Sequence, residues 1–233
     1  MVIINTNKAK SKSWTNNTLK LVTLALFIAL AYVCVYVFHI KVAFLTFDIK
    51  DAVITVAAMI FGPLSAVMMS LAVSFIEMIT ISDTRLYGFV MNVLSTVSLS
   101  ATASLVYKYK RNMFGAVLGL ITGVITMTAV MMAANLIVTP FYMGTTISEV
   151  AALIPKLLLP FNFTKAVLNA SIAMLLYKPV ITALRRAGII RLGHTEYGFD
   201  KKTVMVMIIA VCLIAACIIV FVNVLGGEFA WVD

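Results

Sequence analysis

The chain has 233 residues, of which 63% are hydrophobic and only 12% are charged. A soluble domain carries about 25% charged residues, so this composition excludes an ordinary water-soluble globule. It predicts an all-α integral membrane protein, a bundle of helices in the cell membrane. The net charge of +9 fits an anionic membrane surface, and we expect no nucleic-acid partner.

Seven apolar segments are predicted in chain order, at 18–38, 49–61, 63–81, 86–107, 113–138, 161–184 and 203–225. The second is short for a span, which needs about 20 residues, and Gly62-Pro63 separates it from the third because proline disfavours helix at the preceding residue. We divide the chain into a polar cytoplasmic N-terminus (1–17), a membrane domain of six helices (18–186), a basic cytoplasmic linker (187–202) and an extra C-terminal membrane segment with its tail (203–233).

The positions of the basic residues predict the orientation. If the N-terminus is cytoplasmic and the segments alternate, the inner side holds 13 of the 18 basic residues. These are Lys8, Lys10, Lys12, Lys20, Lys108, Lys110, Arg111, Lys178, Arg185, Arg186, Arg191, Lys201 and Lys202. The outer side holds Lys41, Lys50, Arg85, Lys156 and Lys165. Lys and Arg favour the cytoplasmic side, so we expect a multi-pass protein with its N-terminus inside and its tail outside.

Two connections on the predicted outer side, 39–50 and 139–160, are longer than minimal turns. The inner turns at 62–63 and 107–112 are short. Long loops in compact proteins often serve as lids or binding loops. We therefore expect the functional site at the outer face.

No P-loop motif is present, and His39 and His194 fall on opposite sides of the predicted membrane. No two acidic residues share the middle of a span. We therefore predict no catalytic residue and no metal site. The alternative from another class is a membrane enzyme acting on a lipid or prenyl substrate, with Asp48, Asp51 and Glu77 around a metal.

Each of these acidic residues also has a structural interpretation. Asp51 suits the N-terminus of the short second helix. Glu77 lies late in the third segment, where a carboxylate is costly unless it is paired or near water. We expect Glu77 to reach the outer interface rather than to pair with Arg85 or Lys165.

Polar side chains near the outer ends of the fifth and sixth segments are candidates for binding. Asn162 and Lys165 are three residues apart, so they share one helix face. Together with Asn135 they offer donors and acceptors for a polar, non-cationic small molecule. The alternative is that Lys165 extends to the lipid headgroups and Asn162 caps its helix.

Small residues recur at four-residue spacing in two segments. Gly115, Gly119 and Gly123 predict close packing within the bundle. Ala25 and Ala29 in the first segment fit either internal packing or contact with a partner helix.

Three stretches carry a family resemblance: 45–51 (LTFDIKD) followed by 60–64 (IFGPL), 160–169 (PFNFTKAVLN), and 176–178 (LYK). Together they resemble the riboflavin-specific substrate-binding subunits, or S components, of energy-coupling-factor (ECF) transporters. The resemblance covers about 20–186. The additional apolar run at 203–225 departs from the family, whose members end soon after the sixth helix.

The resemblance implies a six-helix bundle with an outward-facing vitamin pocket closed by the loop after the first helix. It implies ligand contacts by Asn135, Asn162 and Lys165, with lid contacts around Leu45, Thr46 and Asp48. It also implies that Ala25 and Ala29 dock onto a transmembrane coupling subunit. Two cytosolic ATPase subunits would power uptake, which accounts for the missing P-loop.

Riboflavin presents a flat apolar ring, an imide edge and a chain of hydroxyls, and a pocket for it needs apolar walls with a few directed polar groups. Candidate walls are Phe44, Phe47, Met91, Phe141 and Tyr142. We expect no cofactor, with riboflavin as the transported ligand. The alternatives are an S component for thiamine, folate or pantothenate, and a membrane scaffold or sensor without cargo.

Overall fold

The computed structural model describes residues 6–190, 201–223 and 228–229 of the chain. Most of the predicted basic linker and most of the tail after 223 lie outside the described residues. The elements, in order, are α1 (Thr6–Val37), β1 (His39–Val42), β2 (Leu45–Asp48), α2 (Lys50–Phe61), α3 (Pro63–Thr80), α4 (Arg85–Tyr109), α5 (Met113–Met143), α6 (Ile147–Leu153), the π-helix η1 (Ile154–Leu158), α7 (Leu159–Arg186), α8 (Lys201–Asn223) and β3 (Glu228–Phe229).

The chain is a multi-pass helical membrane protein. Within the described residues, six helical segments are long and apolar enough to cross a bilayer: Asn17–Val37, Pro63–Thr80, Arg85–Tyr109, Met113–Met143, Ile147–Arg186 and Thr203–Asn223. The predicted all-α class is confirmed, and so is the additional C-terminal helix, α8. The short second segment is also a helix, α2, although its 12 residues are fewer than the about 20 that a full span needs.

α2 lies inside the bundle. Ten consecutive residues, 50–59, are buried. After Lys50 and Asp51 the helix is apolar on nearly every side, as expected of a helix in an interior. It ends at Gly62, whose φ of 100° suits glycine, and Pro63 begins α3 in the first helical turn, where no N–H is needed. This tight turn returns the chain along α2.

α4 and α5 pack closely through the predicted glycines. A Cβ atom on Gly119 would lie 2.6 Å from the carbonyl oxygen of Ala103, and one on Gly123 would lie 2.8 Å from that of Leu99. Both separations are shorter than van der Waals contact, so only glycine fits. The prediction that these residues pack within the bundle is confirmed.

Both long connections, 39–50 and 139–160, contain more regular structure than expected. The 39–50 connection is an antiparallel hairpin in which His39 pairs with Asp48 and Val42 with Leu45. Much of 139–160 is helical, because α5 continues to Met143 and a capping box at Thr146 starts α6. The prediction of an open loop at 139–160 is therefore wrong.

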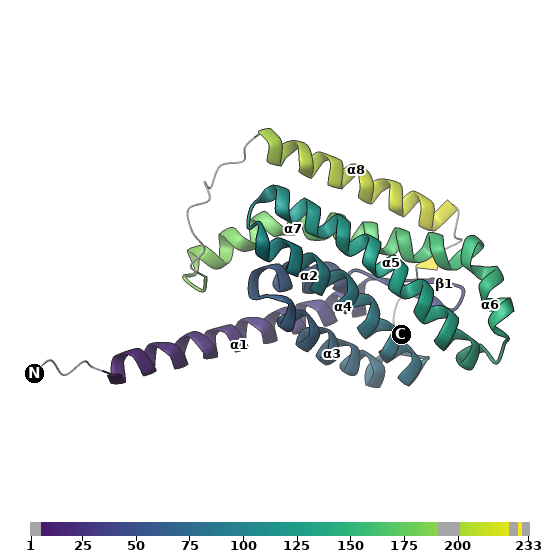
Figure 1. The fold of residues 1–233 in the computed structure, drawn as a ribbon, viewed down its shortest axis with the longest axis horizontal. Helices are drawn as coiled ribbons and strands as arrows, with labels where there is room; N and C mark the ends of the chain where they lie inside the picture. Colours follow the sequence, from purple (N-terminus) through teal and green to yellow (C-terminus); the bar gives the residue numbers. More distant parts are fainter. Residues whose placement is uncertain (1–5, 191–200, 224–227, 230–233) are drawn as a thin grey trace, which may run out of the picture.

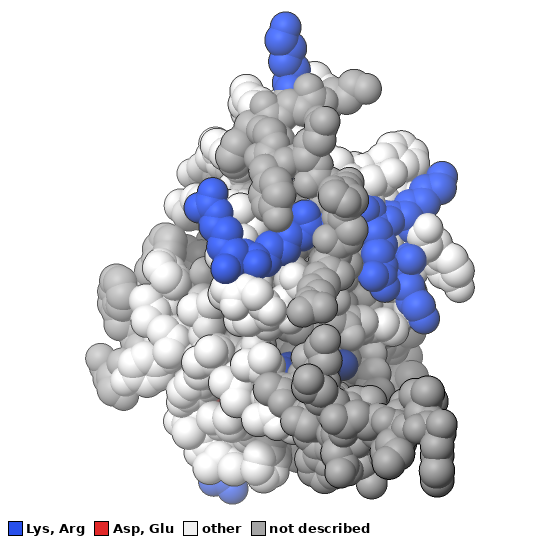
Figure 2. Space-filling model, turned by 90° about the vertical axis from the view of Figure 1, so that its left-hand side faces the viewer, with Lys and Arg blue, Asp and Glu red and all other residues white. Residues whose placement is uncertain are grey.

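The helices run between two ends of the molecule (Figure 1). The hairpin, the α3–α4 turn and α6 lie at one end, which we call the hairpin end. The α2–α3 and α4–α5 turns lie at the opposite end, which we call the turn end. Figure 2 looks onto the turn end, where several Lys and Arg side chains and no Asp or Glu are visible.

Candidate functional site

A cavity of about 580 Å³ opens at the hairpin end. It is lined by the end of α1, the hairpin turn, the end of α3 with the α3–α4 turn, the adjoining part of α4 and the parts of α5 and α7 nearest the hairpin. The lining residues are Val35, Ala43, Phe44, Leu45, Thr46, Glu77, Thr80, Ile81, Ser82, Asp83, Thr84, Tyr87, Gly88, Met91, Asn92, Ser95, Met131, Asn135, Val138, Thr139, Tyr142, Phe161, Asn162 and Lys165. Its size is within the range of about 300–1,000 Å³ for small-molecule sites.

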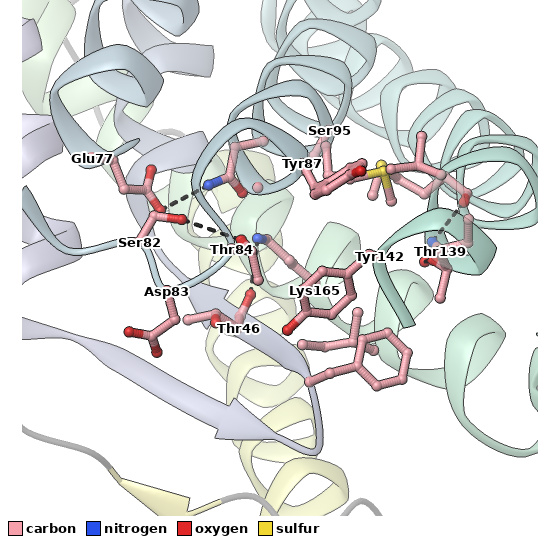
Figure 3. Close-up of a pocket in the computed structure, with 18 of the residues that line it drawn as sticks. Thr46, Glu77, Ser82, Asp83, Thr84, Tyr87, Ser95, Thr139, Tyr142 and Lys165 are labelled. Atoms are coloured by element: carbon pink, nitrogen blue, oxygen red, sulfur yellow. Dashed lines mark hydrogen bonds between the residues drawn. The ribbon is translucent and has the colours of Figure 1, made fainter. Parts of the chain in front are cut away.

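Most of the residues predicted from sequence line this cavity. They are Phe44, Leu45, Thr46, Met91, Asn135, Tyr142, Asn162 and Lys165. Figure 3 shows Thr46 of the hairpin near Lys165 of α7, with Thr139 and Tyr142 of α5 on another side. Residues distant in the sequence are therefore gathered around one space.

Two predicted wall residues lie elsewhere. Phe47 does not line the cavity and is packed against Phe221 of α8. Phe141 is 75% exposed on α5 and is also absent from the lining. Both predictions are wrong because the hydrophobicity of a residue does not determine the direction in which its side chain points. Tyr87 and Phe161 are the additional aromatic residues of the lining.

The two asparagines each keep polar capacity for a ligand. The Asn162 side-chain NH₂ donates to the Leu158 carbonyl at 2.8 Å, one turn earlier in the chain. The Asn135 NH₂ donates to the Met131 carbonyl at 2.7 Å, and its oxygen accepts from Thr139 at 2.9 Å. An asparagine side chain has two N–H donors and two acceptor lone pairs, so neither side chain is saturated. Asn162 does not cap its helix.

Lys165 is buried, and its ammonium is paired. Its Nζ donates to Asp48 Oδ2 at 2.9 Å and to the carbonyl of Thr46 at 3.3 Å. The interpretation that Lys165 extends to lipid headgroups is therefore wrong. An ammonium has three donors, and these two bonds leave one for the cavity.

A second buried lysine lies behind the cavity wall. Lys50 Nζ donates to Glu77 Oε2 at 2.6 Å and contacts Asp48 Oδ2 at 3.4 Å. Glu77 Oε1 accepts from Asn92 at 2.8 Å. The expectation that Glu77 reaches the outer interface is wrong, because the first residue of α2 brings a cation to it inside the bundle.

Asp48 is fully buried and does not line the cavity. Burial alone would raise the pKa of its carboxyl, but the ammonium groups of Lys165 and Lys50 and their hydrogen bonds outweigh burial and lower this pKa to about 2. Asp48 does not reach the cavity, where a lid contact was expected. Asp48 links the hairpin to Lys165.

The carboxylates of the alternative enzyme hypothesis are already engaged. Lys50 joins Asp48 to Glu77, while Asp51 accepts hydrogen bonds from Ser95 and Thr96. Within the described part of the chain, no group of three His, Cys, Asp or Glu side chains is arranged to hold a metal ion. The acidic residues form salt bridges and helix contacts in place of a metal site.

Sequence reasoning found Met91 on α4 but missed the other residues that this helix contributes to the cavity. Asn92 and Ser95 line the cavity together with Tyr87 and Met91. An asparagine in an apolar run was the signal that singled out Asn135, and Asn92 carries the same signal in 86–107. Its three-residue spacing from Ser95 also places both on one helix face.

Comparisons with known proteins agree with this architecture. The model of the family described as "ECF transporter, substrate-specific component" matches residues 19–177. The riboflavin transporter RibU of Staphylococcus aureus (strain TCH60) is 28% identical over 177 residues, which cover 72% of this chain and 93% of that protein. A solved structure described under "Structure and mechanism of the S component of a bacterial ECF transporter" matches with a TM-score of 0.61 and 28% identity, over 72% of this chain and 98% of that chain.

Proposed function

This chain belongs to the substrate-specific components, or S components, of ECF transporters, and we propose that riboflavin is the solute it binds. The family consists of transport components rather than enzymes. Binding occurs in the cavity at the hairpin end, and the chain performs no covalent chemistry. The RibU relative supports this choice of vitamin.

The charge pairing of the two buried ionic residues in the lining, Lys165 and Glu77, is the observation that carries the proposal. Lys165 is compensated by Asp48, and Glu77 is compensated by Lys50. A charged ligand would lose its hydration on entering the cavity. Neither pair offers an unpaired opposite charge to compensate for that cost. Riboflavin is uncharged at neutral pH, whereas thiamine is a cation and folate and pantothenate are anions. The balanced pairs therefore favour riboflavin over these alternatives.

The lining also matches riboflavin in chemical character. Phe44, Tyr87, Tyr142 and Phe161 provide aromatic surface for a flat ring system. The polar groups of Asn92, Asn135, Asn162 and Lys165 can meet the imide edge and the ribityl hydroxyls. Apolar walls with a few directed polar groups are typical of vitamin-sized sites.

The direct test is flavin binding by the purified full chain in detergent. We expect a yellow, flavin-like absorption spectrum, or quenching of flavin fluorescence when riboflavin is added at micromolar concentration. Thiamine, folate and pantothenate serve as competitors and should not displace it. A colourless preparation that binds no added riboflavin would overturn the proposal.

We further propose that α1 docks onto a transmembrane coupling subunit driven by two cytosolic ATPases. Ala25 and Ala29 are exposed on α1, and small residues four apart allow close helix approach. The double variant Ala25→Leu, Ala29→Leu should bind riboflavin normally but take up little of it in cells that contain the partner subunits. The control is Ala215→Leu, Ala216→Leu, which adds equal bulk to exposed positions of α8. Normal uptake by the α1 variant would refute this docking face.

We also propose that the turn end faces the cytoplasm, with the N-terminus inside. The exposed basic residues of the turn end support this orientation (Figure 2). Single cysteines at Lys110 and Ser148, in a chain without its native cysteines, should differ in their labelling by a membrane-impermeant maleimide in intact cells. We expect labelling at Ser148 and none at Lys110. The reverse result would invert the orientation.

A further inference from the structure

α8 lies beyond the region that the family model matches, which ends at residue 177. It packs along α7 (Figure 1). Its buried residues are Thr203, Ala210, Cys217 and Phe221, at intervals of seven, seven and four, which place them on one narrow face. The other side of α8 is exposed and apolar, as expected for a helix in lipid. α8 therefore contacts the bundle through one stripe.

The stripe ends at Phe221, whose side chain is 0% exposed. Its ring lies 4.4 Å from that of Phe47 and 5.7 Å from that of Phe161, measured between centroids, and the second pair is edge-to-face. Phe47 belongs to β2, and Phe161 lies near the start of α7 and lines the cavity. Phe221 thus joins the hairpin to the cavity wall.

Two adjacent residues of β2, Thr46 and Phe47, point to the cavity and to α8 respectively. Side chains alternate along a strand, and Thr46 lines the cavity while Phe47 packs with Phe221, Val42 and Leu168 in one apolar cluster. The backbone of β1 also pairs with β3, which follows α8, giving the strand order β2-β1-β3. The C-terminal part of the chain is therefore attached to the hairpin at two places.

We propose that Phe221 is a positioning residue that holds the hairpin closed over the cavity, so that α8 slows the release of bound riboflavin. This inference rests on the proposed function. The turn residues 43–46 cover the cavity from the hairpin, and lifting them separates Phe47 from Phe221. Contacts that must break before a ligand leaves act mainly on its dissociation rate.

The test is stopped-flow measurement of riboflavin dissociation from the purified full chain. Phe221→Ala should release riboflavin roughly tenfold faster, because it removes two aromatic pairs. Val222→Ala, at the neighbouring exposed position of α8, is the control and should leave the rate unchanged. Phe221→Leu keeps apolar bulk without the ring and should give an intermediate rate. If the alanine variant fails to fold, the leucine variant still tests the inference.

A second measurement separates positioning from general stability. Amide hydrogen exchange in 45–48 of the ligand-free protein should be faster in Phe221→Ala or Phe221→Leu than in Val222→Ala, while exchange in α4 and α5 stays unchanged. Equal dissociation rates and equal hairpin exchange in all variants would overturn the inference while leaving riboflavin binding intact. If the unaltered chain binds no riboflavin, the proposed function fails, and the exchange data alone decide whether Phe221 holds the hairpin.

Discussion

Two neighbouring polar regions at the hairpin end differ in how many of their charges and hydrogen-bonding groups have partners within the protein. In the buried ion cluster, made of Asp48, Lys50 and Glu77, each charge faces an opposite charge within the protein. On the cavity wall, Asn135 and Asn162 use part of their hydrogen-bonding capacity within their own helices. The first region resembles a protein interior, whereas the second has donors and acceptors left for a ligand.

Glu77 and Lys165 each belong to both regions, since Glu77 of the ion cluster also lines the cavity. Lys165 completes the ion cluster through Asp48 and also lines the cavity. A charged residue that is buried near a pocket therefore need not be a binding residue. Lys50 and Lys165 are both buried lysines beside one aspartate, and only Lys165 reaches the cavity. Variants in the two regions should therefore separate folding stability from binding.

The largest effect is expected for Lys50→Met. Removing this ammonium leaves Glu77 without its cation and weakens the compensation of Asp48, and breaking a buried ion pair costs roughly 3–5 kcal/mol. The unfolding midpoint in detergent should fall strongly. Lys156→Met, at an exposed position of η1, is the control and should change stability by less than about 0.5 kcal/mol. An equally small effect at Lys50 would mean that the cluster does not stabilise the bundle.

Lys165→Met should affect both properties. Loss of the hydrogen bond to Asp48 lowers stability, and loss of the donor in the cavity weakens riboflavin binding by roughly 1–3 kcal/mol, the range for stranding a buried polar partner. Titration of riboflavin and thermal unfolding of the same sample measure the two effects. A change in stability with unaltered affinity would assign Lys165 to the ion cluster alone.

Asn162→Ala should act on binding with little effect on the fold. We expect affinity to fall by roughly 1–3 kcal/mol, because a ligand polar group loses its partner. The matched control is Asn169→Ala on the same helix, since Asn169 bonds to the backbone of Ala52 and Asp48 and does not line the cavity. That variant should lose stability instead. The opposite pattern would contradict the division of the two regions.

The last effect is a pH dependence confined to acid. The pKa of Asp48 is lowered from 3.8 to about 2 in the folded protein. Its contribution to stability is therefore complete above about pH 4 and is lost as pH falls from about 4 towards 2. The difference in unfolding midpoint between the unaltered chain and Asp48→Asn should be constant from pH 7 to 5. It should become smaller as the pH falls below 4. A difference that stays the same from pH 7 down to pH 2 would contradict the lowered pKa.

Local patterns predicted much of the fold and part of the candidate site. Long apolar runs identified the spans because lipid tolerates few exposed polar groups, and the Gly-Pro turn placed the boundary between α2 and α3. The three-residue spacing of Asn162 and Lys165 placed both on the face of α7 that lines the cavity. These features depend on hydrophobicity and helical periodicity, which act over a few residues.

Which residues far apart in the sequence pair with each other could be seen only in the tertiary structure. Lys165 meets Asp48 across 117 positions of sequence, and Lys50 meets Glu77 across 27, neither of which follows from spacing along a helix. The direction of Phe47 towards Phe221 also depends on how α8 packs against the bundle. The sequence by itself determined a helical membrane protein with polar residues near the ends of several spans. Only the tertiary structure decided which of them form a closed ion cluster and which line a cavity, because burial and charge pairing are settled by packing between helices.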